Sequence, residues 1–118
     1  MGQEQHEGFR IYEDIRGVGI SFSVQDVQNL HAASVNPGAV RGNHFHDQEE
    51  VLCIMGGRSI CQIEIRDKSK DFEKKIIAEK DVEAFVIPKG CIHTVRNKGE
   101  KAFFLVSFLR KKRNKQGS

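Results

Sequence analysis

The sequence predicts an all-β protein, and two observations carry that prediction. Short apolar segments recur at regular spacing between glycine-bearing breaks, whereas helical periodicity is weak throughout. Within several segments apolar and polar residues alternate, which gives a strand one buried and one solvent-facing side. A chain of 118 residues supports one hydrophobic core. We therefore expect one domain with about nine or ten strands.

The first half of the chain contains two clear strand patterns. Residues 17–24 place valine, isoleucine and phenylalanine at every second position. Residues 50–55 form a mostly apolar run that ends at Gly56-Gly57, a signal for a tight turn. Both segments have the length and boundaries of strands.

The second half continues the same pattern. Residues 61–66 alternate between apolar and polar side chains, and a polar loop separates them from an expected strand at 72–78. A further strand at 82–87 stops at Pro88, because proline lacks the N–H donor that a sheet needs. Residues 102–109 are apolar enough for a central strand.

Both chain ends are expected to be loose. The predicted domain spans residues 8–110, with flexible ends at 1–7 and 111–118. The net charge of +3 includes five Lys and Arg side chains close to the C-terminus, so the remainder is slightly acidic. No aromatic stacking platform accompanies this basic tail, and we expect neither nucleic-acid nor membrane binding.

The cysteines and the hydropathy of the sequence indicate in which cellular compartment the protein is expected. The three cysteines, Cys53, Cys61 and Cys91, contain no C-x-x-C pair and are expected to be small buried residues. The sequence has no apolar run of membrane-spanning length and no visible secretory leader. We expect a reducing, cytoplasmic location.

Candidate metal ligands occur in two short clusters. His44, His46 and Glu50 have the same parity, so an extended strand can present them to one side. His93 follows a Pro-Lys-Gly turn in the second cluster. A closed β-barrel would bring His93 across to the first three residues and would also remove exposed sheet edges. Imidazole and carboxylate groups suit Zn, Fe, Mn, Ni or Co, and ligands from one side leave positions open for substrate.

Two other interpretations of these residues remain open. In the first the histidines are strand residues without a ligand role, and in the second they act as acid and base without a metal. In a metal-free site Glu50 would pair with a histidine and raise its pKa. Metal ligation is favoured, because a carboxylate facing three imidazoles inside a barrel is costly unless it binds a cation or is hydrogen-bonded.

Both clusters resemble the two motifs of the cupin superfamily. The first motif is matched at every spacing by Gly38, His44, His46, Glu50 and Gly57. The second is matched by Pro88, Gly90, His93 and Asn97, with Val82 in place of its leading glycine. The resemblance implies a double-stranded β-helix, or jelly-roll barrel, with a divalent metal on His44, His46, Glu50 and His93. It also implies a homodimer.

A narrower resemblance concerns cupins that modify nucleotide-activated sugars. The segments Asp14-Ile15-Arg16-Gly17 and Arg41-Gly42-Asn43-His44-Phe45-His46 are similar to segments of the 3,4-ketoisomerases, the 3,5-epimerases and the cupin domain of capsular-polysaccharide reductases. This resemblance implies that Arg16 and Arg41 hold a diphosphate, for which a forked guanidinium is suited. Asn97 is expected to contact substrate as well.

We therefore expect an isomerase or epimerase that acts on a small keto or nucleotide-activated sugar through an enediolate. The candidate catalytic residues are His44, His46, His93 and the single tyrosine, Tyr12. A metal-dependent dioxygenase and a cupin that binds a small ligand without turnover are the alternatives. Two further histidines, His6 and His31, lie outside both motifs and are expected to be ordinary residues.

Overall fold

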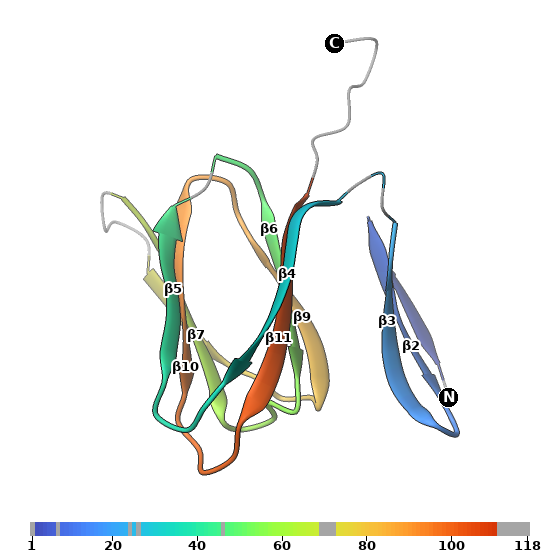
Figure 1. Ribbon diagram of the computed structural model, residues 1–118. Helices are drawn as coiled ribbons and strands as arrows, with labels where there is room; N and C mark the ends of the chain where they lie inside the picture. The colour runs from blue at the N-terminus through green and yellow to red at the C-terminus, as the bar shows by residue number, and fades with distance from the viewer. Residues whose placement is uncertain are drawn as a thin grey trace, which may run out of the picture.

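The computed structural model describes residues 2–6, 8–23, 25, 27–45, 47–68 and 73–110, apart from the side chains of Asn43 and His44. These residues form strands and no α-helix, which confirms the all-β prediction (Figure 1). None of them belongs to a helix with the length and apolar character that a membrane crossing requires.

The described strands form three antiparallel sheets. The N-terminal sheet has the order β1-β2-β3 and consists of β1 (Gln3–His6), β2 (Phe9–Asp14) and β3 (Gly17–Phe22). The second sheet has the order β5-β10-β7-β8 and consists of β5 (Val40–Phe45), β10 (Cys91–Asn97), β7 (Cys61–Asp67) and β8 (Glu73–Ile77). The third has the order β4-β11-β6-β9 and consists of β4 (Val27–Val35), β11 (Phe103–Arg110), β6 (Glu50–Met55) and β9 (Val82–Ile87).

The two four-stranded sheets face each other and form a jelly-roll barrel (Figure 1). The strands expected at 50–55 and 82–87 have the same bounds in the structure. The apolar segment near residue 105 is a central strand as expected, because β11 pairs with β4 on one side and β6 on the other. From β4 to β11 consecutive strands alternate between these two sheets, except that β7 and β8 pair within one sheet. The strands that carry the two motif clusters therefore belong to one barrel.

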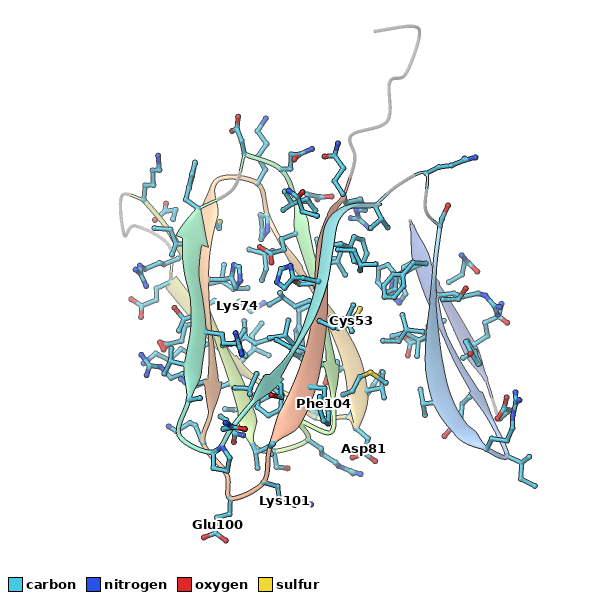
Figure 2. The ribbon with its side chains drawn as sticks, viewed as in Figure 1. Cys53, Lys74, Asp81, Glu100, Lys101 and Phe104 are labelled. Carbon is cyan, nitrogen blue, oxygen red and sulfur yellow. The ribbon has the colours of Figure 1, made fainter. Side chains whose placement is uncertain are left out.

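Strand β6 buries both of its faces, and β11 does so along most of its length, with Phe104 exposed on its outer face. Inward side chains such as Leu52 and Ile54 pack in the barrel core. Outward side chains such as Val51 and Cys53 pack with Phe9 and neighbouring residues of the N-terminal sheet. Side chains fill the space between this sheet and the barrel (Figure 2). Burial on both faces explains why these strands are mostly continuous apolar runs.

Part of the N-terminal end that was expected to be flexible, residues 1–7, forms a strand. Residues Gln3–His6 form β1, which pairs with β2 along its whole length. The His6 ring stacks on Phe9 with ring centroids 4.5 Å apart. The segment Gln-Glu-Gln-His is polar, and its pairing with β2 is therefore invisible to hydrophobic patterning. Residues 111–118 lie outside the described part of the chain.

Candidate functional site

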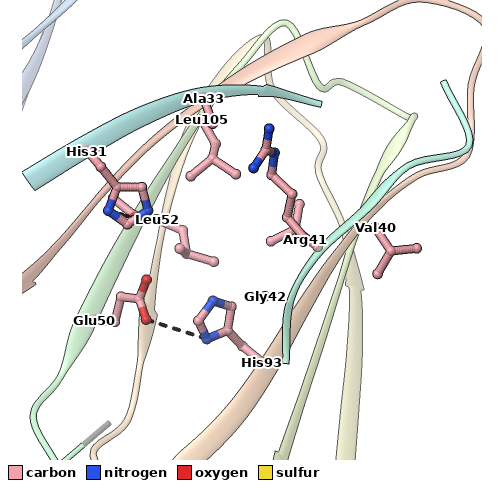
Figure 3. Close-up of a pocket in the computed structure, with 11 residues that line it drawn as sticks. His31, Ala33, Val40, Arg41, Gly42, Glu50, Leu52, His93 and Leu105 are labelled. Carbon is pink, nitrogen blue, oxygen red and sulfur yellow. Dashed lines mark hydrogen bonds and ion pairs between the residues drawn. The ribbon is translucent and has the colours of Figure 1, made fainter. Parts of the chain in front are cut away.

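A cavity of about 440 Å³ opens between the two sheets of the barrel. Strand β4 supplies one wall, β5 supplies the opposite wall, and β6, β10 and β11 supply the floor (Figure 3). The lining residues are His31, Ala33, Val40, Arg41, Gly42, Glu50, Leu52, His93, Val95, Leu105 and Ser107. The cavity thus combines an apolar lining with a few polar groups, which is the usual composition of a small-molecule site.

Glu50 and His93 meet on the floor of this cavity. Glu50 is the first residue of β6 and His93 lies in β10, so the two come from opposite sheets. Their side chains point toward each other with Oε1 3.5 Å from Nδ1 (Figure 3). Both residues are almost completely buried, at 5% and 3% exposure. The expected convergence of the two sequence clusters is therefore present for these two residues.

The surroundings of Glu50 act on its pKa in opposite directions. Burial raises the pKa of Glu50, because removal from water disfavours the carboxylate. The charge of His31 and a hydrogen bond with Ser107 lower that pKa and only partly offset the effect of burial. A buried carboxyl group with such neighbours is typical of a functional site.

His31 was expected to be ordinary, and the structure instead places it in the cavity wall. Its Nε2 lies 2.8 Å from Oγ of Ser107, its direct cross-strand partner on β11. His31 shares parity with Ala33, which also lines the cavity, and with the fully buried Val35. The sequence therefore contained a signal that His31 faces the barrel interior. Most residues of β4 are exposed or half-buried, so the strand shows no clear alternation that would have revealed this signal.

Gly42 allows β5 to approach His93 closely. The register between β5 and β10 shifts after the pair His93 and His44, so the next pair joins Thr94 to Gly42. Gly42 has φ = 102°, and a Cβ there would lie 2.8 Å from the carbonyl oxygen of His93. A bulge of this kind re-aims side chains beside a site. The backbone of His44 lies directly opposite His93.

The other two expected metal ligands are His44 and His46. The side chain of His44 and the whole of His46 lie outside the described residues. No group of three or more His, Cys, Asp or Glu side chains able to hold a metal occurs among those that are described. Two of the four expected ligands, Glu50 and His93, are therefore together in the cavity.

The described donor pair fits a cation. The separation of 3.5 Å is longer than a charge-assisted N–H···O bond, which is about 2.7–2.9 Å. Two donors that each lie about 2.1 Å from one ion at a tetrahedral angle are about 3.4 Å apart. The spacing of Glu50 and His93 therefore matches two ligands of a shared divalent metal, and carboxylate and imidazole are suitable donor types.

Of the two arginines expected to bind substrate, only Arg41 lines the cavity. Its Nε donates a hydrogen bond of 2.9 Å to the carbonyl oxygen of Ser34 on β4. Arg41 extends from β5 across to β4, and its guanidinium lies beside that strand (Figure 3). This places a fixed positive charge at the mouth of a pocket whose floor holds Glu50 and His93.

Arg16 and Tyr12 lie on the N-terminal sheet rather than in the cavity, so their positions do not support the expected roles. Arg16 is in the turn between β2 and β3, is 82% exposed, and forms an ion pair with Asp14. The Tyr12 ring lies across its strand partner Gly19 and beneath the guanidinium of Arg10. Tyr12 alternates with the buried Phe9 and Ile11 and therefore faces away from the barrel.

Asn97 also lies outside the cavity lining, and its position does not support substrate contact. Its side chain is buried and donates hydrogen bonds to the carbonyl oxygens of Val35 and Lys101. Its Oδ1 accepts a hydrogen bond from the backbone N–H of Gly99. Asn97 thus braces the turn between β10 and β11. Cys91, which was expected to be buried, is half-buried and packs against the barrel core.

Comparisons with known proteins support this fold. A family model described as Cupin matches residues 23–118. The capsular polysaccharide assembling protein CapF from Staphylococcus aureus is similar over 88% of this chain, with a TM-score of 0.62 and 21% identity. The chain spans only 29% of the length of CapF.

Two further solved structures are similar. An oxalate oxidase matches 69% of this chain and 41% of its own, with a TM-score of 0.56 and 25% identity. A Bacillus halodurans protein matches 79% of this chain and 69% of its own, with a TM-score of 0.53 and 20% identity. No curated protein sequence matches the chain.

Proposed function

The chain belongs to the cupin family, and on that premise we propose that it binds a divalent metal in the barrel and acts on a small oxygen-rich substrate. The ligands would be Glu50 and His93, joined by His44 and His46. The reaction we propose is isomerisation or epimerisation of a keto or nucleotide-activated sugar.

The observation that carries this proposal is the meeting of Glu50 and His93. A glutamate and a histidine that are 5% and 3% exposed face each other at 3.5 Å on the floor of a cavity. Burying a carboxylate is expensive unless it is compensated by charge and hydrogen bonds. The pairing of His93 with the backbone of His44 supports His44 as a third ligand.

Each residue of the cavity would have a distinct task. The metal would supply a Lewis acid for a developing oxyanion. Arg41, fixed by Ser34, would bind an anionic group of the substrate at the mouth. Because Tyr12 and Cys91 lie outside the cavity lining, the proton would be moved by an imidazole of the pocket. The apolar side chains of Leu52, Val95 and Leu105 would exclude water.

The relatives support the choice of substrate class. CapF assembles capsular polysaccharide and has been crystallised with the inhibitor 3-isopropenyl-tropolone. The oxalate oxidase has been crystallised with glycolate. Tropolone and glycolate each present neighbouring oxygen atoms, and oxygen donors are accepted by many divalent metals. A small ligand with adjacent oxygens would suit the floor and mouth of this cavity.

A second candidate function is metal-dependent oxidation by dioxygen. The likeness to oxalate oxidase favours it, since that protein has the same barrel fold. Metal identity separates the two candidates. Stoichiometric iron in the untagged protein would favour oxygen chemistry, whereas zinc cannot change its oxidation state and would favour proton transfer.

The direct test is elemental analysis of untagged wild-type protein beside Glu50→Gln and His93→Ala variants. We expect a metal content near one ion per chain in the wild type and a large loss in both variants. Circular dichroism would verify that the variants keep the fold. Arg16→Gln is the matched control, because Arg16 is exposed and lies on the N-terminal sheet.

Two results would contradict the proposal. The first is wild-type protein that contains no metal and takes up none from added Zn²⁺, Co²⁺, Mn²⁺ or Fe²⁺. The second is full metal occupancy in a folded His93→Ala variant. The first result would favour a metal-free site in which histidines act as acid and base. The second would show that His93 is not a ligand of the bound metal.

A further inference from the structure

Three polar side chains form a row across the inner face of the sheet that carries Glu50. Ser107 on β11 is the direct cross-strand partner of His31 on β4 and of Leu52 on β6. Glu50 is two residues before Leu52 and is therefore the diagonal neighbour of Ser107. His31, Ser107 and Glu50 thus cross three adjacent strands and lead from the cavity wall to its floor.

Ser107 stands out on a strand that is otherwise apolar on its inner face. The inward residues of β11 include Phe103, Leu105 and Leu109, all of them buried. Ser107 is fully buried at 0% exposure. A buried hydroxyl group is costly unless it is hydrogen-bonded, and this one bonds His31 and Glu50. An alanine at position 107 would fill the core as well as serine does, so packing alone does not explain the hydroxyl group.

The donors and acceptors of this row have one consistent arrangement when Glu50 is a carboxylate. A carboxylate only accepts hydrogen bonds, so the Ser107 hydroxyl donates its single proton to Glu50. The Ser107 oxygen is then left to accept, and Nε2 of His31, 2.8 Å away, donates to it. The direction of each bond is thus determined by its neighbour.

We propose that Ser107 and His31 are positioning residues of the metal centre: the Ser107 hydroxyl, held by the His31 imidazole, orients the Glu50 carboxylate toward His93. This inference rests on the proposed function, since it needs Glu50 to be a ligand. Partners that hydrogen-bond a ligating carboxylate fix its orientation, and their loss typically weakens metal binding by about 10- to 100-fold.

The test measures the dissociation constant of Co²⁺, by chelator competition, for untagged wild type and four variants. The variants are Ser107→Ala, His31→Phe, His31→Gln and the double variant Ser107→Ala/His31→Phe. Ser107→Ala should weaken binding about 10- to 100-fold. His31→Phe keeps a planar ring without a donor and should weaken binding in the same direction. His31→Gln can still donate to Ser107 and should bind close to wild type.

The double variant shows whether the effect of His31 on metal binding passes through Ser107 or arises independently of it. If His31 acts only through the Ser107 hydroxyl, the double variant should bind Co²⁺ as Ser107→Ala does. If the two substitutions act independently, the losses of Co²⁺ affinity in the single variants would multiply in the double variant, and this result would overturn the proposal. The absorption spectrum of bound Co²⁺ should change in Ser107→Ala and His31→Phe, a change that a purely structural role would not cause. His6→Phe is the remote control.

The melting temperature of metal-free protein supplies the remaining control. If Ser107→Ala fails to fold, the His31→Phe variant still tests the proposal, because His31 is exposed and its replacement should leave the fold intact. A wild-type affinity for Co²⁺ in His31→Phe would overturn the proposal. Failure of the proposed function looks different, because wild type would then bind no Co²⁺ or would bind it independently of Glu50. Binding that depends on Glu50 but not on Ser107 or His31 would overturn this inference alone.

Discussion

The backbone of Gly42 leaves no room for a side chain against His93. A Cβ at Gly42 would lie 2.8 Å from the His93 carbonyl oxygen and 3.3 Å from its ring carbon Cδ2. Backbone atoms cannot yield as a flexible side chain can. The close approach of β5 and β10 at this point therefore depends on glycine and holds His93 in the cavity floor.

Gly42→Ala should displace His93 and weaken metal binding. The substitution combines the steric clash with a φ of 102°, a conformation that costs a non-glycine residue about 1–3 kcal/mol. Gly38→Ala is the matched control, because Gly38 has φ = 79° but nothing within 4 Å of an added Cβ. Both variants should lose stability in urea denaturation, and only Gly42→Ala should lose Co²⁺ affinity. Equal affinities would contradict the role of this contact.

Phe108→Ala should destabilise the protein far more than Phe104→Ala. Phe108 is 1% exposed and makes edge contacts with Phe9 and Phe22 of the N-terminal sheet. Its loss should cost about 3–5 kcal/mol of unfolding free energy. Phe104 lies on the same strand and is 59% exposed, so its loss should change stability by about 0.5 kcal/mol or less. Similar denaturation midpoints would show that the N-terminal sheet does not pack on β11.

Glu64→Gln should remove a pH-dependent contribution to stability. The guanidinium of Arg96, with Nε 2.7 Å from Oε1, lowers the pKa of Glu64 below its ordinary value of 4.5. A lowered folded-state pKa stabilises the protein fully above the unfolded value, and this stabilisation is lost as the pH falls through the folded pKa.

The expected size of this effect is small. Because Arg96 is 46% exposed, solvent screens the pair, and the difference at neutral pH should be about 0.3–1 kcal/mol. Urea denaturation of wild type and Glu64→Gln at several pH values would measure it. The two curves should converge in acid, and a gap that stayed constant with pH would contradict the ion-pair explanation.

Thiol labelling should distinguish Cys91 from the other two cysteines. Burial raises the pKa of Cys53 and Cys61 to about 12, and both have 0% exposure. Cys91 is only half-buried, although burial and the nearby Asp67 also raise its pKa. Iodoacetamide should therefore modify Cys91 first, at a rate that increases with pH. Mass spectrometry would locate the label, and equally fast native labelling of Cys53 would contradict the described core.

Strands with strong local signals were predictable from sequence. Residues 50–55 and 82–87 are bounded by a glycine pair and a proline, and the structure has strands with those bounds. Strand β1 was missed because its four residues are polar and its stability depends on pairing with β2. Local patterning carries no information about such a partner.

The site was predictable only in part, for a related reason. Glu50 and His93 belong to spaced motifs, and the structure brings them together. His31 and Ser107 belong to no motif, and only the register between β4 and β11 pairs them. Asn97 belongs to a motif and yet bonds the backbone of its own turn. Motif membership therefore did not separate cavity residues from residues that brace the turns.

The two-sided burial of β6 has a practical consequence for protein engineering. Val51 and Cys53 pack behind the same floor strand that presents Glu50 and Leu52 to the cavity. Libraries that vary these two outward positions would change how rigidly the floor is packed, while the side chains that line the cavity stay unchanged. Rigidity and recognition can thus be varied separately in this barrel.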